Sequence, residues 1–148
     1  MQPLNEYYQI IGKDFDLSEL NGFIIETISK SKYLQQLKQN IISNNAAIHI
    51  RNGDYLQIPL YYKTFDRIEY LKKALNLIPN EIKSIDVFSD DNELNKKTYG
   101  DIFKTRFNNV NYINGNDECT DLLMLSLHRI KILWNSTFSL WSAYIGNM

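Results

Sequence analysis

The chain has 148 residues, of which 44% are apolar and 13% aromatic, enough for one folded domain with a buried core. Its net charge of -1 and the absence of a basic run argue against a nucleic-acid partner. The single cysteine, Cys119, excludes an internal disulfide, and two histidines are too few for a His-rich metal centre. No apolar run is long enough to span a membrane, and the first residues lack the basic start and apolar middle of a signal peptide. We therefore expect a cytoplasmic protein that is at most peripheral to a membrane.

The chain is predicted to begin with a helical lead-in segment over residues 1–45. Apolar residues recur there at spacings of three and four, most regularly over Leu17–Ile42, as on one face of a helix. The domain proper then extends over residues 46–148. It opens with a strand at Ala46–Arg51, in which apolar and polar residues alternate.

Polar residues mark the end of this first strand. His49 and Arg51 lie at its carboxyl end, and Gly53 in the following turn is free to take a positive φ. Open α/β sheets bind ligands at such strand ends, and an arginine there suits phosphate because its charged guanidinium donates two parallel hydrogen bonds. The alternative is an ordinary surface turn, and this stretch alone does not decide between the two.

Helices and strands alternate along the rest of the chain. This alternation predicts right-handed βαβ units, hence an α/β fold with a Rossmann-like parallel sheet flanked by helices. In chain order the predicted elements are a helix over Phe65–Ile78, a strand over Ser84–Phe88, a short helix over Asn92–Tyr99, a strand over Val110–Ile113, a largely buried apolar helix from Asp117 to about His128, a strand over Ile130–Trp134 and a helix over Phe138–Asn147.

Two further polar clusters follow predicted strands, and each has a structural alternative. In Ser89-Asp90-Asp91 we favour helix capping for Asp91 and leave Asp90 open between capping and ligand contact. Ser136 or Thr137 can cap the last helix, whose free amides would also form an anion site. Because the carboxyl ends of parallel strands share one edge of a sheet, the clusters can meet around one ligand, which favours the phosphate interpretation.

Three other residues have mainly structural interpretations. Asp121, in a first helical turn, favours the helix dipole, although a carboxylate there could also accept the paired donors of a guanine ring. His128 is expected at the end of the same helix, where its ring interacts with the dipole. Cys119 is expected to be a small buried residue. No glycine-rich loop of the ATP or dinucleotide type is present.

Six blocks of sequence resemble, in the same order, motifs of the α-1,2-fucosyltransferases of glycosyltransferase family 11. His49–Tyr55 matches the family's His-x-Arg-Arg-Gly-Asp-Tyr at all but one fixed place, and the Phe-Ser-Asp-Asp motif is intact at Phe88–Asp91. The other similar blocks are Tyr70–Ala74, Tyr112–Asn116, Asp121–Ser126 and Asn135–Trp141. Together they cover roughly residues 46 to 145.

The resemblance implies the donor-binding half of a GT-B enzyme. Such an enzyme would transfer fucose from GDP-β-L-fucose to a galactose 2-hydroxyl with inversion, forming an α-1,2 linkage, and would need neither cofactor nor metal. The implied partners are GDP-fucose and an oligosaccharide or lipid-linked glycan acceptor in surface polysaccharide biosynthesis. The implied location is the cytoplasm, with peripheral contact at the inner face of the membrane.

The resemblance also implies roles for individual residues. Arg51 would hold the β-phosphate and offset charge on the departing GDP, the one catalytic role. His49 and Asp121 would bind the guanine and ribose end, and Asp54 would brace the arginine turn. The remaining implied binding residues are Asp90 and, for the diphosphate, Ser136, Thr137 and Ser139.

The chain departs from the family pattern in two places. Asn52 stands where the motif has a second arginine, from which we expect donor binding weaker by about 1–3 kcal/mol if the lost contact was buried. The Gly-x-Leu-Gly-Asn-Gln start of the family's amino-terminal domain, which helps shape the acceptor site, is not found in this sequence. The alternative functions are therefore a non-catalytic GDP-sugar binding module, including a truncated inactive fragment, and, ranked last, an interaction domain without a nucleotide site.

Overall fold

The computed structural model describes residues 26, 42–57 and 66–146, without the side chains of Asp54 and Tyr55. The chain divides into two compact units, Met1–Gln39 and Asn40–Met148. The second unit contains all the elements described below. The helix predicted over Leu17–Ile42 lies almost wholly outside the described residues.

Four strands form a single parallel sheet in the order β3-β2-β1-β4. The strands are β1 (Ile42–Ile50), β2 (Ser84–Ser89), β3 (Asn109–Tyr112) and β4 (His128–Ile132). In the register of the two central strands, His49 lies beside Phe88 and Ile50 beside Ser89. The parallel α/β sheet expected from the sequence is thus confirmed.

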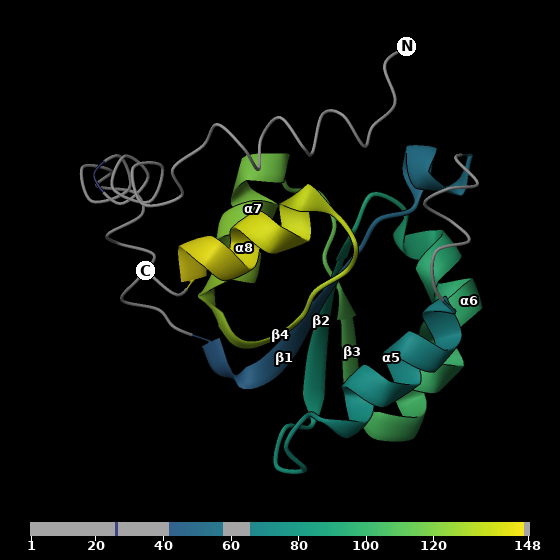
Figure 1. Ribbon diagram of the computed structural model, residues 1–148. Helices are drawn as coiled ribbons and strands as arrows, with labels where there is room; N and C mark the ends of the chain where they lie inside the picture. The colour runs from purple at the N-terminus through teal and green to yellow at the C-terminus, as the bar shows by residue number, and fades with distance from the viewer. Residues whose placement is uncertain (1–25, 27–41, 58–65, 147–148) are drawn as a thin grey trace, which may run out of the picture. The chain divides into compact units, whose positions relative to one another are not determined.

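Helices cover both faces of the sheet. Helices α5 (Arg67–Asn76) and α6 (Asn92–Arg106) lie on one face, and α7 (Glu118–Leu127) and α8 (Thr137–Gly146) lie on the other (Figure 1). The chain moves outward from β1 to β3 and then crosses back to β4, so right-handed connections place the later helices on the opposite face. The short 3-10 helix η1 (Gly53–Leu56) follows β1 directly.

The two faces of the sheet bury different side chains. Ala46, Ile48 and Ile50 belong to the larger apolar core, which includes residues of α5 and α6. Ala47 belongs to a smaller cluster with Phe88 and with Leu125 of α7. Because side chains alternate along a strand, His49 lies on the same face as Ala47, toward α7 and α8.

Aspartates are the N-cap residues of three helices, α5, α6 and α7. Asp91 accepts a hydrogen bond from the Leu94 amide (2.9 Å), and Asp117 accepts one from the Thr120 amide (2.7 Å), as predicted. Asp66, which was not predicted as a cap, accepts from the amides of the second and third residues of α5. These caps position α6 and α7 at the strand ends where the polar clusters lie.

Two element boundaries differ from the prediction by four residues or more, because tertiary contacts override local sequence. Strand β1 begins at Ile42, four residues early, because Ile42 pairs with the first residue of β4 across a register shift. Helix α6 continues to Arg106 instead of ending at Tyr99. Both Tyr99 and Phe103 are buried in the core, and this burial carries the helix past Gly100.

Helix α7 is more exposed than its apolar sequence predicted. Only Leu125 and Ser126 are buried, since the helix packs with one side on α8 and the sheet. Cys119, expected inside, is exposed on the first turn. Strand β4 follows the helix directly, so His128 is the first residue of the strand and not part of the helix, and the strand ends at Ile132 instead of Trp134.

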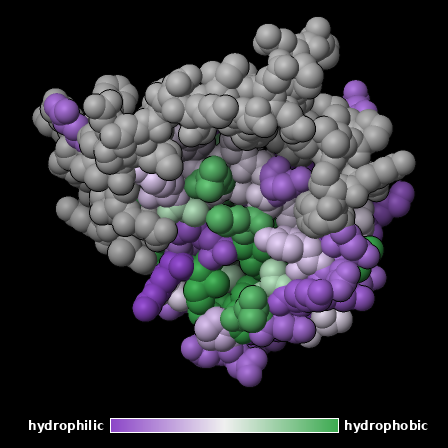
Figure 2. Space-filling view, in the orientation of Figure 1, coloured by the Kyte–Doolittle hydropathy of each residue, from purple (hydrophilic) through white to green (hydrophobic). Residues whose placement is uncertain are grey.

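Apolar side chains gather in the middle of the face shown in Figure 2, in the region of the edge strand β4, and hydrophilic side chains border them. A shallow groove there is lined by residues of α5 and β4 and of the segments that follow them, among them Leu77, Ile130 and Ile132. It contains none of the predicted site residues. In the described part of the chain, no helix has the combination of length and apolar character needed to cross a membrane.

Candidate functional site

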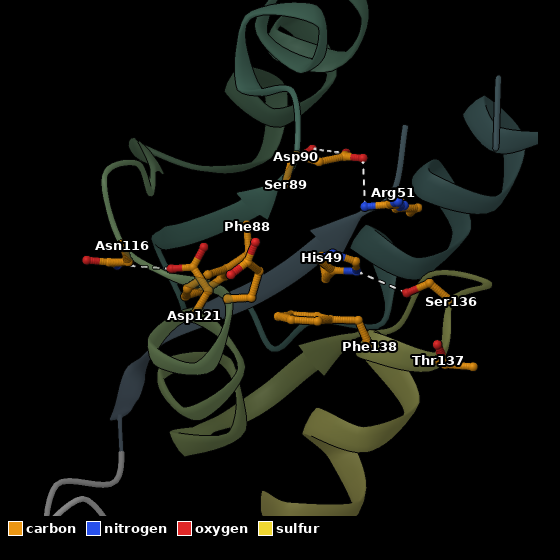
Figure 3. A pocket seen from close by; sticks show the side chains of 11 residues that line it. His49, Arg51, Phe88, Ser89, Asp90, Asn116, Asp121, Ser136, Thr137 and Phe138 are labelled. Atoms are coloured by element: carbon orange, nitrogen blue, oxygen red, sulfur yellow. Dashed lines mark hydrogen bonds and ion pairs between the residues drawn. The ribbon is translucent and has the colours of Figure 1, made fainter. Parts of the chain in front are cut away.

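A cavity of about 640 Å³ opens at the carboxyl edge of the sheet, a size suited to a small-molecule ligand. It brings together the ends of β1 and β2, the segment between β4 and α8, and the start of α7 (Figure 3). Its lining residues are His49, Arg51, Phe88, Ser89, Asp90, Asn116, Glu118, Asp121, Ser136, Thr137 and Phe138. The convergence of three strand ends expected from the sequence is therefore present.

The strand order explains why a cavity forms here. Strands β1 and β4 are neighbours, but the chain leaves β1 toward α5 on one face and leaves β4 toward α8 on the other. The two connections diverge at the carboxyl edge and leave a crevice between them. Open α/β sheets bind ligands at such a switch point.

Arg51 provides the positive charge of the cavity. One guanidinium nitrogen lies 3.0 Å from Asp90 Oδ2 in an ion pair, and 38% of its side chain is exposed. The pair holds the guanidinium at the cavity while leaving part of it open to solvent. A guanidinium placed in this way can donate to a phosphate group.

The turn after Arg51 is held by the same carboxylate. Asp90 Oδ1 accepts a hydrogen bond from the Asn52 amide at 2.9 Å. Gly53 has a φ of +31°, confirming the expected positive value, and a Cβ at this position would lie 2.6 Å from Asp90 Oδ2. Only glycine lets the carboxylate approach this closely, so Asp90 and Gly53 together determine where Arg51 points.

His49 lies deeper in the cavity and is 6% exposed. Its Nδ1 is 2.8 Å from Ser139 Oγ and 3.2 Å from Ser136 Oγ, and its ring stacks at a tilt on Phe138 with centroids 4.6 Å apart. Burial lowers the pKa of His49 to about 4; nearby Asp90 opposes this shift and Arg51 adds to it. At neutral pH the ring is therefore uncharged, with one nitrogen donating and the other accepting.

The first turn of α8 forms the wall beside His49. Ser136 is its N-cap, because its Oγ accepts the Ser139 amide at 3.1 Å. The amides of the two helical residues before Ser139, Thr137 and Phe138, have no partner within a helix and belong to residues that line the cavity. The helix thus presents the positive end of its dipole to a bound anion.

Carboxylates lie on the side of the cavity opposite Arg51. Figure 3 shows Asp121 of α7 facing Arg51 across the cavity, with His49 and Phe138 between them. Asp121 Oδ1 accepts a hydrogen bond from Asn116 Nδ2 at 2.9 Å, and Glu118 also lines this side. The cavity therefore has a cationic end and an acidic end, which suits a ligand with phosphate at one end and hydrogen-bond donors at the other.

This geometry occurs in a chain whose sequence has known relatives. The model of glycosyl transferase family 11 matches residues 4–147. The chain belongs to this family. No solved structure matches it significantly.

Two curated relatives come from Escherichia coli. An α-1,2-colitosyltransferase is 34% identical over 116 residues, which cover 71% of this chain and 37% of that protein. The O-antigen biosynthesis glycosyltransferase WbnK is 31% identical over 113 residues, which cover 70% of this chain and 35% of WbnK. The chain thus spans about a third of the length of each relative.

Most residues named from the family 11 motifs lie on the cavity wall, but one lies behind it. Ser139 is fully buried, and its Oγ contacts the Trp134 amide (3.2 Å) and His49 instead of the cavity. A direct contact between Ser139 and a diphosphate does not fit this position. The side chain of Asp54 lies outside the described residues, so its bracing role stays a prediction.

Four wall residues were not expected from the sequence: Phe88, Asn116, Glu118 and Phe138. Phe88, Asn116 and Phe138 lie within the family 11 blocks, but the resemblance implied no role for them. Glu118 directly follows Asp117, the N-cap of α7. Acidic residues are common in the first turn of a helix, so the local sequence gave no signal that Glu118 lines a cavity. In the described part of the chain, no three or more His, Cys, Asp or Glu side chains group closely enough to hold a metal ion.

Proposed function

We propose that this domain binds the donor nucleotide sugar of a family 11 transferase, with GDP-fucose as the donor. The observation that carries the proposal is the two-ended cavity: Arg51 and the α8 N-terminus at one end, Asp121 at the other. The family membership and the names of the two relatives support glycosyl transfer, and one name supports an α-1,2 linkage.

The cationic end of the cavity is proposed to bind the diphosphate. The Arg51 guanidinium, the hydroxyls of Ser136 and Thr137 and the first amides of α8 would all donate to phosphate oxygens. When the bond between the sugar and the β-phosphate breaks, negative charge grows on that phosphate. Donors already held in place stabilise this charge without reorganising, which is the catalytic role proposed for Arg51.

The acidic end is proposed to bind the guanine. A carboxylate can accept two parallel hydrogen bonds from the N1–H and the amino group of guanine, an arrangement that adenine does not offer. The hydrogen bond from Asn116 Nδ2, which holds the Asp121 carboxylate at the cavity, supports this role. The neutral ring of His49, between the two ends, is proposed to contact the ribose and guanine side of the ligand.

The acceptor is proposed to be a galactose 2-hydroxyl of an oligosaccharide or lipid-linked glycan, in polysaccharide assembly at the inner face of the membrane. The O-antigen biosynthesis role in the name of WbnK supports this setting. Binding without turnover is the second candidate, because the aligned sequence reaches only about a third of each relative. Release of GDP from GDP-fucose or GDP-colitose on addition of a galactoside separates the two candidates.

Thermal unfolding with GDP, ADP and UDP tests donor binding. At a hundredfold excess over Kd, GDP is expected to stabilise the domain by about 2.7 kcal/mol. For a chain of this size, that raises Tm by roughly 5–10 °C. Arg51→Ala is expected to abolish the shift, and Arg129→Ala, which removes an exposed arginine on β4, is expected to keep it. A folded wild-type chain with no GDP shift would overturn the proposal.

A further inference from the structure

Asn52, which stands in place of a motif arginine, points away from the cavity. It is 2% exposed, whereas the adjacent Arg51 is more than one-third exposed at the cavity wall. Asn52 is absent from the residues that line the cavity. Its side chain therefore does not line the cavity, and the weaker donor binding expected from the replaced arginine stays a prediction.

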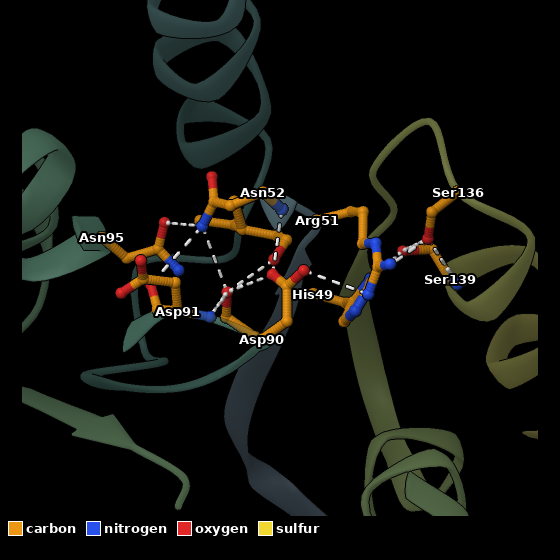
Figure 4. Close-up of polar contacts among 10 residues, drawn as sticks. His49, Arg51, Asn52, Asp90, Asp91, Asn95, Ser136 and Ser139 are labelled. Carbon is orange, nitrogen blue, oxygen red and sulfur yellow. Dashed lines mark hydrogen bonds and ion pairs between the residues drawn. The ribbon is translucent and has the colours of Figure 1, made fainter. Parts of the chain in front are cut away.

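The side-chain amide of Asn52 joins the arginine turn to α6. Its Nδ2 donates to Asn95 Oδ1 at 2.9 Å, and Ser89 Oγ and the Asp91 carbonyl lie at 3.3 and 3.4 Å (Figure 4). Asn95 is fully buried on the second turn of α6. The shortest of these contacts is thus a buried hydrogen bond between two amides that are 43 residues apart in sequence.

The backbone of the same residue continues the connection to Arg51. The Asn52 amide donates to Asp90 Oδ1, and the other oxygen of Asp90 holds the Arg51 guanidinium. Ser89 Oγ, in turn, donates to the Ile50 carbonyl at 2.7 Å. Asn95, Asn52 and Asp90 therefore form one continuous path from α6 to the cation of the cavity.

A neutral amide suits this location for an electrostatic reason. Asn95 lies near the amino-terminal end of α6, where the helix dipole is positive. An arginine side chain at position 52 that pointed toward α6, as Asn52 does, would place a buried positive charge against the positive end of that helix. Asn52 avoids the charge and still donates to the helix.

We propose that Asn52 and Asn95 form a positioning pair that fixes the arginine turn against α6 and so orients Arg51 for its ligand. The pair acts through Asp90 and touches no ligand. The pair orients Arg51 in the protein without ligand. The effect of the pair on GDP affinity rests on the proposed function. Donor binding in this chain would then depend on one well-oriented arginine.

The test compares Asn52→Ala and Asn95→Ala with the wild-type chain in two measurements. The first is the order of the Arg51 Nε–H group without ligand, from ¹⁵N relaxation, with Arg51→Lys used for assignment. Both alanine variants are expected to make Arg51 markedly more mobile. The second is GDP affinity, which is expected to fall about tenfold or more, as for a weakened hydrogen bond to a charged group.

Two further variants separate positioning from general loss of stability. Asn95→Asp keeps the acceptor for Asn52 Nδ2 and is expected to retain Arg51 order. Asn92→Ala removes another buried asparagine of α6, one that bonds to the Ile113 carbonyl at 2.7 Å and not to the arginine turn. It is expected to lower stability without changing Arg51 order or GDP affinity.

The inference is overturned if Arg51 stays as ordered in a folded Asn52→Ala or Asn95→Ala variant as in the wild type. Should Asn52→Ala be too unstable to purify, Asn95→Ala removes the same hydrogen bond from the helix side. If the wild-type chain does not bind GDP, the proposed function fails, while the relaxation measurement still decides whether the pair orients Arg51.

Discussion

The Ser139 hydroxyl makes several polar contacts behind the inner wall of the cavity. Its Oγ accepts the Trp134 amide, lies 2.8 Å from His49 Nδ1 and lies 3.3 Å from the Ser136 hydroxyl. Because Ser139 is fully buried, any effect on a ligand must pass through its neighbours on the cavity wall, His49 and Ser136. Two hydroxyls beside Nδ1 allow that nitrogen to accept a hydrogen bond, which would leave Nε2–H as the donor of the neutral ring.

At this residue scale we predict that Ser139→Ala loosens His49. The variant loses the nearest partner of Nδ1 and leaves the Trp134 amide without its acceptor, at a cost of about 1–3 kcal/mol in the free energy of unfolding. The ¹⁵N shifts of the His49 ring are expected to report a single tautomer in the wild type, with a pKa about 4, and a mixture in the variant.

Ser142→Ala is the matched control for this prediction. Ser142 is also fully buried on α8, but its hydroxyl donates to the Ser139 carbonyl at 2.7 Å and does not contact His49. The ring shifts are expected to stay at their wild-type values. A wild-type tautomer spectrum in Ser139→Ala would contradict the positioning of His49 by Ser139.

One carboxylate connects all four strands at the scale of secondary-structure elements. Asp86 of β2 accepts from Asn45 of β1 (3.2 Å), Asn111 of β3 (2.7 Å) and His128 of β4 (2.8 Å). The other ring nitrogen of His128 lies 2.9 Å from the Met124 carbonyl in the last turn of α7. This contact confirms a structural role for His128 and joins the helix to the sheet.

Asp86 should therefore make stability depend on pH at the acidic end. Burial raises its pKa, but the hydrogen bonds from His128, Asn111 and Asn45 outweigh burial and hold the pKa below its ordinary value of 3.8. A carboxyl group with a lowered folded-state pKa stabilises the fold above its unfolded-state pKa. That stability is lost as the pH falls through the folded-state pKa.

We predict that Asp86→Asn lowers the free energy of unfolding at pH 6 by about 1–3 kcal/mol, since charged hydrogen bonds are replaced by neutral ones. Below pH 4 the difference between variant and wild type is expected to shrink. Urea denaturation between pH 2.5 and 6 measures both effects. The fully exposed Asp101 of α6 provides the control Asp101→Asn, with a change within about 0.5 kcal/mol. A difference independent of pH would show that Asp86 acts through packing alone.

The two ends of the cavity come from separate parts of the chain. Arg51 follows β1, whereas Asp121 begins α7 after β3, and the strand order brings both to the carboxyl edge. Under the proposed function, the cationic end would hold the diphosphate common to all nucleoside diphosphates. The acidic end would then distinguish the base, which makes base selection a property of the assembled molecule.

At this scale we predict that Asp121→Asn lowers GDP affinity about tenfold or more, because one of two acceptors for guanine becomes a donor. The weak affinities for ADP and UDP are expected to stay unchanged, and titration calorimetry measures all three. Glu118→Gln, which neutralises the other acid of this end, is the matched control. Loss of GDP binding in Glu118→Gln but not in Asp121→Asn would assign the guanine contact to Glu118.

Local signals in the sequence predicted most elements and several site residues. The caps at Asp91, Asp117 and Ser136 depend on neighbours within three residues, so turn chemistry alone identifies them. The positive φ of Gly53 follows from its place in a turn. Cys119 was placed wrongly because an apolar sequence does not tell which side of a helix is covered.

The sequence by itself determined the α/β class, the helix caps at Asp91, Asp117 and Ser136, and the family. It also placed Arg51, His49 and Asp121 at predicted element ends, because all of these depend on short spacings and ordered motifs. Only the tertiary structure decided that Ser139 lies behind His49, that Asn52 faces α6 and that Asp86 meets His128. These contacts join residues 42 to 90 positions apart. Such pairs are set by strand order, register and side-chain direction, which arise only when the sheet is assembled.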